Sequence, residues 1–261
     1  MSLASSRLLV LLALEVALAQ HCVSWTTSPC RVLEVESAGL RRHAPALLAA
    51  ALSANPQLEE LRLAGPIGSA GATAVASALS KGGQKKLRLI SLWRCDIGDA
   101  AAAEIAAALP GSGVESLYLQ SDALGLQFAQ AIAAALPRSG LLELNVWNNR
   151  LGDEGAAVLA TALGMEKQKK APLRSLNLSR NGLTDAGAAT LARLARPTEI
   201  YLHSNDIGDE GAAAWASALL DKSEGGHIAT LDLSGNARIG GEGLRALASA
   251  ATGSGCEVLA N

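Results

Sequence analysis

The chain of 261 residues is 49% hydrophobic and 18% charged, with a formal net charge of −2 and a pI near 6.1. This composition excludes a mainly disordered chain, and the near-neutral charge argues against the basic surface that nucleic-acid binding needs. Aromatic residues are scarce, with 4 Trp, 2 Tyr and 1 Phe, so their positions are informative.

Residues 1–19 allow two interpretations. The apolar run Leu8–Leu14 follows Arg7, and Ala17-Leu18-Ala19 has the small-x-small form of a signal-peptide cleavage site. Because Glu15 interrupts the apolar region, the alternative is a helix that caps the first element of the fold. A signal peptide predicts a secreted or endomembrane protein, and a capping helix predicts a cytoplasmic one. No other stretch has the length of a membrane span.

Residues 20–31 are expected to form an N-terminal cap. Cys22 and Cys30 lie close together in this segment, where a disulfide is the expected pairing in an oxidising compartment. Their spacing matches no zinc site. Whether the two are bridged stays open at this point.

One phrase then recurs along residues 32–261. Its centre is a pair of apolar residues two positions apart, which predicts a short strand, and successive pairs lie 24 to 32 residues apart. The pairs are Leu33/Val35, Leu61/Leu63, Ile90/Leu92, Leu117/Leu119, Leu144/Val146, Leu176/Leu178, Ile200/Leu202 and Leu231/Leu233. Residues 256–259 fit the beginning of one further strand.

Each strand is followed by a predicted Ala-rich helix. In four copies an aspartate stands at the expected helix start, where a carboxylate can accept hydrogen bonds from free backbone N–H groups: Asp99, Asp153, Asp185 and Asp209. A second apolar residue recurs inside each helix, and Trp215 falls in that column. The sequence therefore predicts Trp215 to be a core residue.

The phrase L-x-L-x-x-N, followed by an apolar residue and by G-D-E-G-A at residues 152–156, resembles the leucine-rich repeat of the ribonuclease-inhibitor type, and NOD-like receptor repeat arrays are similar. The resemblance implies one α/β leucine-rich-repeat solenoid over residues 32–261. It would have a horseshoe shape and about eight strand–helix repeats, with a parallel concave sheet and convex helices.

In that family an asparagine after each strand satisfies the backbone of adjacent turns. The residues in this column, called the ladder, are Cys95, Asp122, Asn149, Asn181, Asn205 and Asn236. The resemblance therefore implies that Cys95 is buried rather than a reactive thiol.

Side chains that alternate with the apolar pairs are expected on the concave face. Four of the seven aromatic residues stand at such positions, and exposed Trp and Tyr are the residues most frequent in binding hot spots. The predicted partner-binding residues are Trp93, Tyr118, Gln120, Glu143, Asn145, Trp147, Asn177, Glu199, Tyr201 and His203. Trp93, Tyr118 and Trp147 come from consecutive copies and are expected to form one patch.

Motifs for catalysis are absent from the sequence: there is no H-E-x-x-H, no G-x-S-x-G and no Cys/His metal spacing. The sequence therefore predicts a non-catalytic module without metal or cofactor that binds a protein on its concave face, and no nucleic acid. The alternatives are a regulator or inhibitor of a specific enzyme, and a detached sensor-type module resembling NOD-like receptor repeats. The partner and the oligomeric state stay open.

Overall fold

The computed structural model describes residues 31–36, 44–165, 173–194, 197–221 and 228–260. The expectations for the signal segment, for the N-terminal cap and for a Cys22–Cys30 bridge lie outside the described residues.

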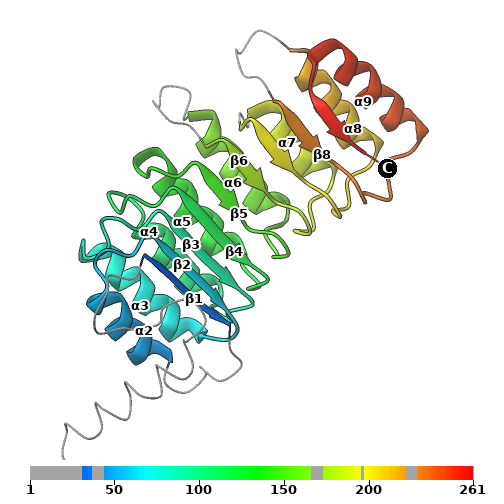
Figure 1. Cartoon of the computed structure of the whole chain (residues 1–261). Coiled ribbons are helices and arrows are strands. Elements are labelled where there is room, and N and C mark those ends of the chain that lie inside the picture. The colour runs from blue at the N-terminus through cyan, green and yellow to red at the C-terminus, as the bar shows by residue number, and fades with distance from the viewer. Residues whose placement is uncertain (1–30, 37–43, 166–172, 195–196, 222–227, 261) are drawn as a thin grey trace, which may run out of the picture.

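Strands and helices alternate along the described chain, and all nine strands form one parallel sheet in sequence order (Figure 1). The strands are β1 (Val32–Glu36), β2 (Glu60–Ala64), β3 (Leu89–Trp93), β4 (Ser116–Gln120), β5 (Glu143–Asn145), β6 (Ser175–Asn177), β7 (Glu199–Tyr201), β8 (Thr230–Asp232) and β9 (Glu257–Leu259). The helices are α2 (Ala44–Ala54), α3 (Gly68–Ser80), α4 (Asp99–Ala107), α5 (Leu126–Ala135) with the short 3₁₀ turn η2 (Leu136–Arg138), α6 (Gly152–Met165), α7 (Asp185–Leu194), α8 (Asp209–Leu220) and α9 (Gly241–Ser254).

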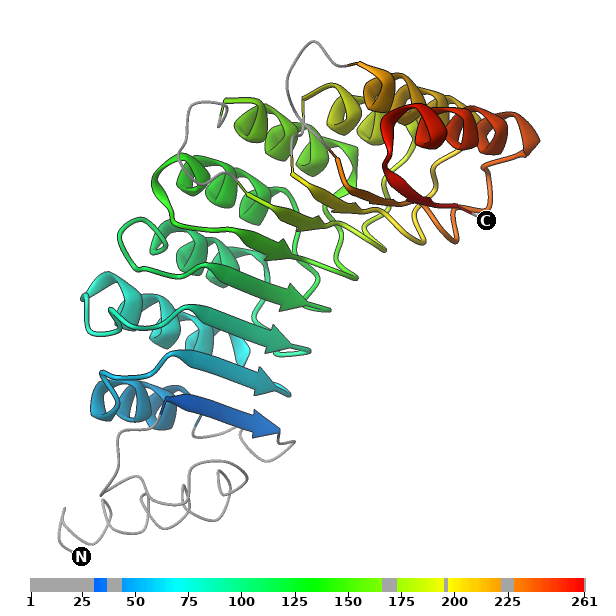
Figure 2. The same ribbon diagram turned by 45° about the horizontal axis from the view of Figure 1, so that its top comes forward.

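The layers form a curved stack. Figure 2 shows the strands lining the inner side of the curve and the helices lining the outer side. This arrangement confirms the predicted α/β solenoid with a parallel sheet, and β9 adds one strand beyond the eight expected copies.

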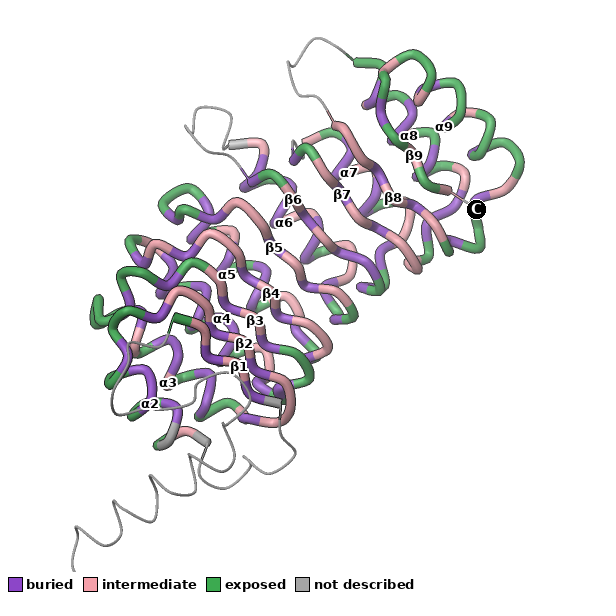
Figure 3. Tube along the Cα trace, in the orientation of Figure 1, coloured by how far each residue is buried: buried purple, intermediate pink, exposed green. Residues whose placement is uncertain are grey.

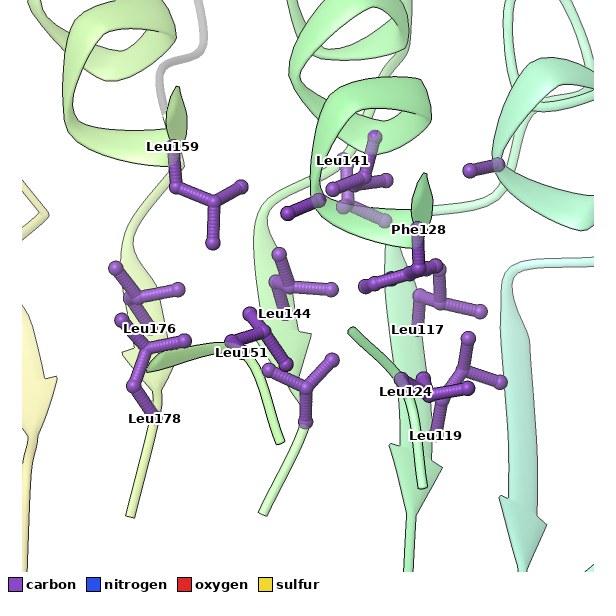
Figure 4. Close-up of a cluster of buried hydrophobic side chains, with 14 of the residues drawn as sticks. Leu117, Leu119, Leu124, Phe128, Leu141, Leu144, Leu151, Leu159, Leu176 and Leu178 are labelled. Carbon is purple, nitrogen blue, oxygen red and sulfur yellow. The ribbon is translucent and has the colours of Figure 1, made fainter. Parts of the chain in front are cut away.

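The core lies between the sheet and the helices. The apolar pairs of the strands are buried, and their side chains point toward the helices, as Leu117, Leu144 and Leu176 do in Figure 4. Along β2, β4, β5, β6, β7 and β8, buried and half-buried residues alternate, while the outer helix surfaces are exposed (Figure 3). Trp215 in α8 is fully buried, as its place in the helix column predicts.

Small residues allow the helices to pack closely side by side. One alanine at the same position of each helix from α3 to α8 is completely buried: Ala72, Ala102, Ala129, Ala156, Ala188 and Ala212. A larger side chain in this column would force the neighbouring helices apart. The Ala-rich composition therefore determines the spacing of the stack.

The helix-start aspartates contact the next repeat and not their own helix. Asp209 begins α8, but its Oδ1 accepts from the N–H groups of Gly240 and Gly243 at the start of α9, at 2.7 and 2.9 Å. Asp99, Asp153 and Asp185 make the same bonds to the starts of α5, α7 and α8. The carboxylate of each aspartate therefore reaches across the stack to the helix of the next repeat.

Candidate functional site

The outward side chains of the sheet form three rows, defined by the strand register. The first row is Val32, Glu60, Leu89, Ser116, Glu143, Ser175, Glu199, Thr230 and Glu257. The second row is Glu34, Arg62, Ser91, Tyr118, Asn145, Asn177, Tyr201, Asp232 and Leu259. The third row is Ala64, Trp93, Gln120, Trp147, Ser179, His203 and Ser234, and beyond Gln120 it follows from backbone hydrogen bonds between neighbouring loops.

Trp93 is the most exposed aromatic residue on this face, with 40% of its surface accessible. The guanidinium carbon of Arg94 lies 4.7 Å from the centroid of its ring, a cation–π distance. Beside Trp93 the sheet has a hollow of about 210 Å³, bordered by Glu34, Arg62 and Ser91. Ala64 leaves this space open, because its side chain is small where the neighbouring strand carries Trp93.

Tyr118 and Glu143 are paired across β4 and β5. The Tyr118 hydroxyl donates to Glu143 Oε2, and Ser116 Oγ lies 3.3 Å from the same oxygen. Burial and the hydrogen bond to Glu143 raise the pKa of Tyr118 to about 12. The phenol therefore stays a hydrogen-bond donor at physiological pH, and it holds the carboxylate in place.

Trp147 pairs with His203 and not with Trp93. Its indole N–H donates to His203 Nε2 at 3.3 Å, although the two residues come from different repeats. Because Nε2 accepts this bond, the neutral ring carries its proton on Nδ1, which lies 2.9 Å from Ser204 Oγ. On the sheet, Gln120 separates Trp147 from Trp93.

Ser179 lies between Trp147 and His203 in the third row and is completely buried. Its alternating position in the sequence predicts an outward side chain, as for the rest of the row. A small serine lets the two larger residues meet over it, and its hydroxyl accepts from the His203 N–H at 3.2 Å. Sequence alternation gives the direction of a side chain but not which neighbours cover it.

The asparagines of the second row bond to the backbone of their own repeat. Asn145 Oδ1 accepts from the Trp147 N–H at 3.0 Å, and Asn177 Oδ1 accepts from the Ser179 N–H at 2.9 Å. Their amide NH₂ groups are therefore the atoms left to contact a partner. Gln120 is half-buried between the two tryptophans.

Tyr201 lies among carboxylates. Its hydroxyl is 3.4 Å from Glu199 Oε2. Burial raises its pKa, and the negative charges of Glu199, Asp232 and Glu257 raise it further. This end of the sheet is therefore electrostatically negative.

The ladder residues follow loop residues with positive φ, which turn the chain back toward the core. These loop residues are Arg94, Ser121, Asn148, Arg180, Ser204 and Gly235. Asn149 illustrates the contacts: its Oδ1 accepts from the N–H groups of Asp122 and Leu124, and its Nδ2 donates to the carbonyls of Leu119 and Val146 at 2.8 and 2.9 Å. Asn205 and Asn236 bond in the same way. Asn181 Oδ1 accepts from the Leu151 N–H, and its Nδ2 donates to the carbonyls of Val146 and Ser179.

Asp122 and Cys95 make fewer contacts at the same positions. Asp122 Oδ1 accepts from the Ile97 N–H at 3.3 Å, whereas its buried Oδ2 has no partner. Cys95 is fully buried, with its Sγ 3.5 Å from the Leu63 carbonyl. Burial and the charge of Asp122 raise the pKa of Cys95 to about 12, so the thiol is unreactive at neutral pH.

Two kinds of feature are absent from the described part of the chain. There, no group of three or more His, Cys, Asp or Glu side chains is placed to hold a metal ion. No helix in that part is long and apolar enough to cross a membrane.

Four segments of the sequence match the family model described as Leucine Rich repeat, at residues 141–160, 169–192, 198–214 and 227–248. Within these four segments the chain contains leucine-rich repeats. The matched repeats run from β5 to α9, and they include Trp147, Tyr201 and His203. No curated protein matches the sequence.

Two crystal structures are among the solved structures that the chain matches. The crystal structure of the Rad7 and Elc1 complex in yeast contains a chain with 16% identity and a TM-score of 0.47; the match covers 78% of this chain and 57% of that one, so this protein spans less than two thirds of its length. An internalin (inlF) from Listeria monocytogenes is 17% identical with a TM-score of 0.36, and the match covers 81% of this chain and 69% of the internalin.

Proposed function

We propose that the protein is a non-catalytic recognition module that binds a protein partner on the concave face of its sheet. The observation that carries the proposal is the placement of aromatic side chains. Trp93, Tyr118, Trp147 and Tyr201 all lie on one face, and each keeps part of its surface accessible. These residue types dominate binding hot spots, because they bury a large area at a small cost in side-chain entropy.

Anchoring residues have different surroundings along the sheet. Trp93 lies beside the hollow at β1–β3, where a partner side chain would find an apolar ring and polar groups together. Trp147 is held by His203, so its ring is ordered before any partner arrives. An ordered anchor favours affinity because less freedom is lost on binding.

The proposal extends to the resemblance to the ribonuclease-inhibitor type and to NOD-like receptor repeats. If that resemblance reflects function, the protein is either an inhibitor or regulator of one enzyme or a sensor-type module. In each case the partner contacts the concave sheet.

Affinity capture with three immobilised forms tests the proposal. The forms are the wild type, Trp93→Ala/Trp147→Ala, and a control in which two exposed leucines of the helical side, Leu220 and Leu244, become alanine. We expect the wild type and the control to retain the same partner and the tryptophan variant to lose it. Retention by the tryptophan variant contradicts the proposal. Because Trp147 also covers Ser179, Trp93→Ala alone is included, and circular dichroism checks each fold.

A further inference from the structure

The strands from β5 to β9 carry acidic side chains and no basic ones. None of these five strands contains lysine or arginine, and their charged residues are Glu143, Glu199, Asp232 and Glu257. Within the described residues none of the four forms an ion pair. Their side-chain hydrogen bonds come from neutral groups such as the Tyr118 and Tyr201 hydroxyls.

The other end of the sheet differs, because its strands contain a cation, Arg62. Glu60 pairs with Arg62 at 2.9 Å, and Glu59 and Glu115 pair with Arg31 and Arg88 at 3.7 and 3.2 Å. The strands β5–β9 therefore carry carboxylates with no cation among them, although the whole chain has a net charge of only −2. A surplus confined to one face of a binding sheet selects a partner of opposite charge.

Three of these carboxylates have a regular spacing. Glu143, Glu199 and Glu257 share the first row and stand on alternate strands, with Ser175 and Thr230 between them. Since neighbouring strands lie about 4.8 Å apart, successive glutamates of this row are about 10 Å apart. An extended polypeptide in the polyproline II form presents the same face every three residues, or about every 9 Å.

Aromatic rings lie in the rows beside these glutamates. Tyr201 stands in the second row next to Glu199, and Trp147 stands in the third row. The guanidinium carbon of Arg180 already lies 5.5 Å from the centroid of the Trp147 ring. A cation over this ring is thus compatible with the local geometry, and aromatic faces also suit proline-rich chains.

We propose that the face of β5–β9 binds an extended basic segment of a protein partner, whose Lys or Arg side chains recur about every third residue and meet Glu143, Glu199 and Glu257. This inference rests on the proposed function and narrows it to one class of partner. Each cation of the segment meets one glutamate of the row, and the rings of Trp147 and Tyr201 contact the chain between them.

Fluorescence anisotropy with two labelled peptides tests the spacing. One peptide consists of three Arg-Pro-Pro units, and the other has the same composition with its arginines adjacent. The wild type is expected to bind the spaced peptide more tightly, with an affinity that falls as salt is added. Equal affinity for the two peptides, or no binding of either, overturns the proposal.

Two variants of equal net charge test the surface. The row variant is Glu143→Gln/Glu199→Gln/Glu257→Gln. The control, Glu104→Gln/Glu210→Gln/Glu242→Gln, changes three exposed helix residues instead. We expect the row variant to bind the spaced peptide about tenfold more weakly or worse, and the control to stay within about twofold of the wild type. An equal loss in both variants means general electrostatic attraction and overturns the proposal.

The captured partner separates this inference from the proposed function. If the partner is lost by Trp93→Ala/Trp147→Ala but kept by the row variant, concave-face recognition stands and the basic segment is wrong. If both variants lose it and the control keeps it, both proposals are supported. If the tryptophan variant keeps the partner, the proposed function is wrong, and the inference that rests on it is wrong as well.

Discussion

Asp122 occupies a ladder position that asparagine holds in the next four copies of the repeat. Where the Nδ2 group of Asn149 donates to two carbonyls, Asp122 has the oxygen Oδ2, which is buried and has no partner. Burial raises the pKa of Asp122 from its ordinary 3.8 to about 6. The carboxyl group of Asp122 therefore stays protonated to a higher pH in the folded protein than in the unfolded chain. When protonated, it can donate a hydrogen bond as an amide does.

This shift gives a pH-dependent prediction for Asp122→Asn. Because the folded pKa lies above the unfolded one, the stability contributed by this group is complete below about pH 4 and is lost as the pH rises through about 6. The asparagine variant avoids that loss. We expect its free energy of unfolding to exceed that of the wild type by about 2–3 kcal/mol at pH 8, with a gain that shrinks toward pH 4.

Urea denaturation of both proteins between pH 4 and pH 8 measures this difference. Asn149→Asp is the matched control, since it places a carboxylate at the next ladder position and is expected to destabilise the protein more as the pH rises. A gain for Asp122→Asn that is the same at every pH would contradict the assigned cause.

Residue-scale features differ in how far the sequence predicts them. The repeat places Cys95 and Asp122 in one column with the asparagines, because columns follow from counting residues within each copy. The bond between Trp147 and His203 and the burial of Ser179 have no such signal. They depend on side-chain sizes at three neighbouring positions of different repeats, which become neighbours only when the register of the sheet is known.

At the scale of elements, the starts of α5, α7, α8 and α9 are each tied to the preceding repeat by a carboxylate. The sequence places Asp209 at the start of α8 but does not tell which helix it caps, since both starts offer free N–H groups. Asp209→Ala removes two charge-assisted bonds to α9. We expect a loss of about 1–2 kcal/mol in the free energy of unfolding, measured by urea denaturation.

Glu210 provides the control for this variant. It lies next to Asp209 in the first turn of α8, but its side chain is exposed. Glu210→Ala also removes a negative charge from the helix start and is expected to cost clearly less. Equal losses in the free energy of unfolding would show that the negative charge at the start of α8 stabilises the protein. The contact between Asp209 and α9 would then not be the cause.

The same contact explains why glycine stands at the start of α9. A Cβ at Gly243 would lie 2.6 Å from Asp209 Oδ1 and 3.0 Å from the Ala212 Cβ. Gly241 has open space around it, with the Arg245 side chain as its nearest neighbour at 3.7 Å. Although alanine is the better helix former, Gly243→Ala is expected to destabilise the protein by about 1–3 kcal/mol.

Gly241→Ala is expected to leave stability unchanged within about 0.5 kcal/mol or to raise it. Thermal unfolding of the two variants compares the same substitution two residues apart in one helix. Equal behaviour of both variants would show that steric crowding by Asp209 is not the reason for the glycine.

At the scale of the molecule, contacts run between neighbouring repeats along the stack. Stability in such an array is the sum of local terms and nearest-neighbour terms. We expect Asp209→Ala to increase amide hydrogen exchange in α8 and α9 and to leave β2–β4 unchanged, as measured by mass spectrometry of peptides. A uniform increase over all repeats would show instead that the array unfolds as one unit.

The fold as a whole was predictable because a repeated phrase fixes strand, helix and order together. Even β1 and β2, whose copies lack asparagine in the ladder column, take their places in the sheet. The hollow beside Trp93 was not predictable, since it arises from one small residue, Ala64, next to a large one on another strand. The row of glutamates likewise becomes regular only through the register of β5, β7 and β9.

Hydroxyl-radical footprinting of the protein with its captured partner tests the central claim, recognition on the concave face, most directly. Trp93 and Trp147 report on that face, and Leu220 and Leu244 report on the helical side. The account predicts that the partner protects the two tryptophans from oxidation and leaves the two leucines as reactive as in the free protein. Protection of the leucines with unchanged tryptophans would place the partner on the helices and contradict the account.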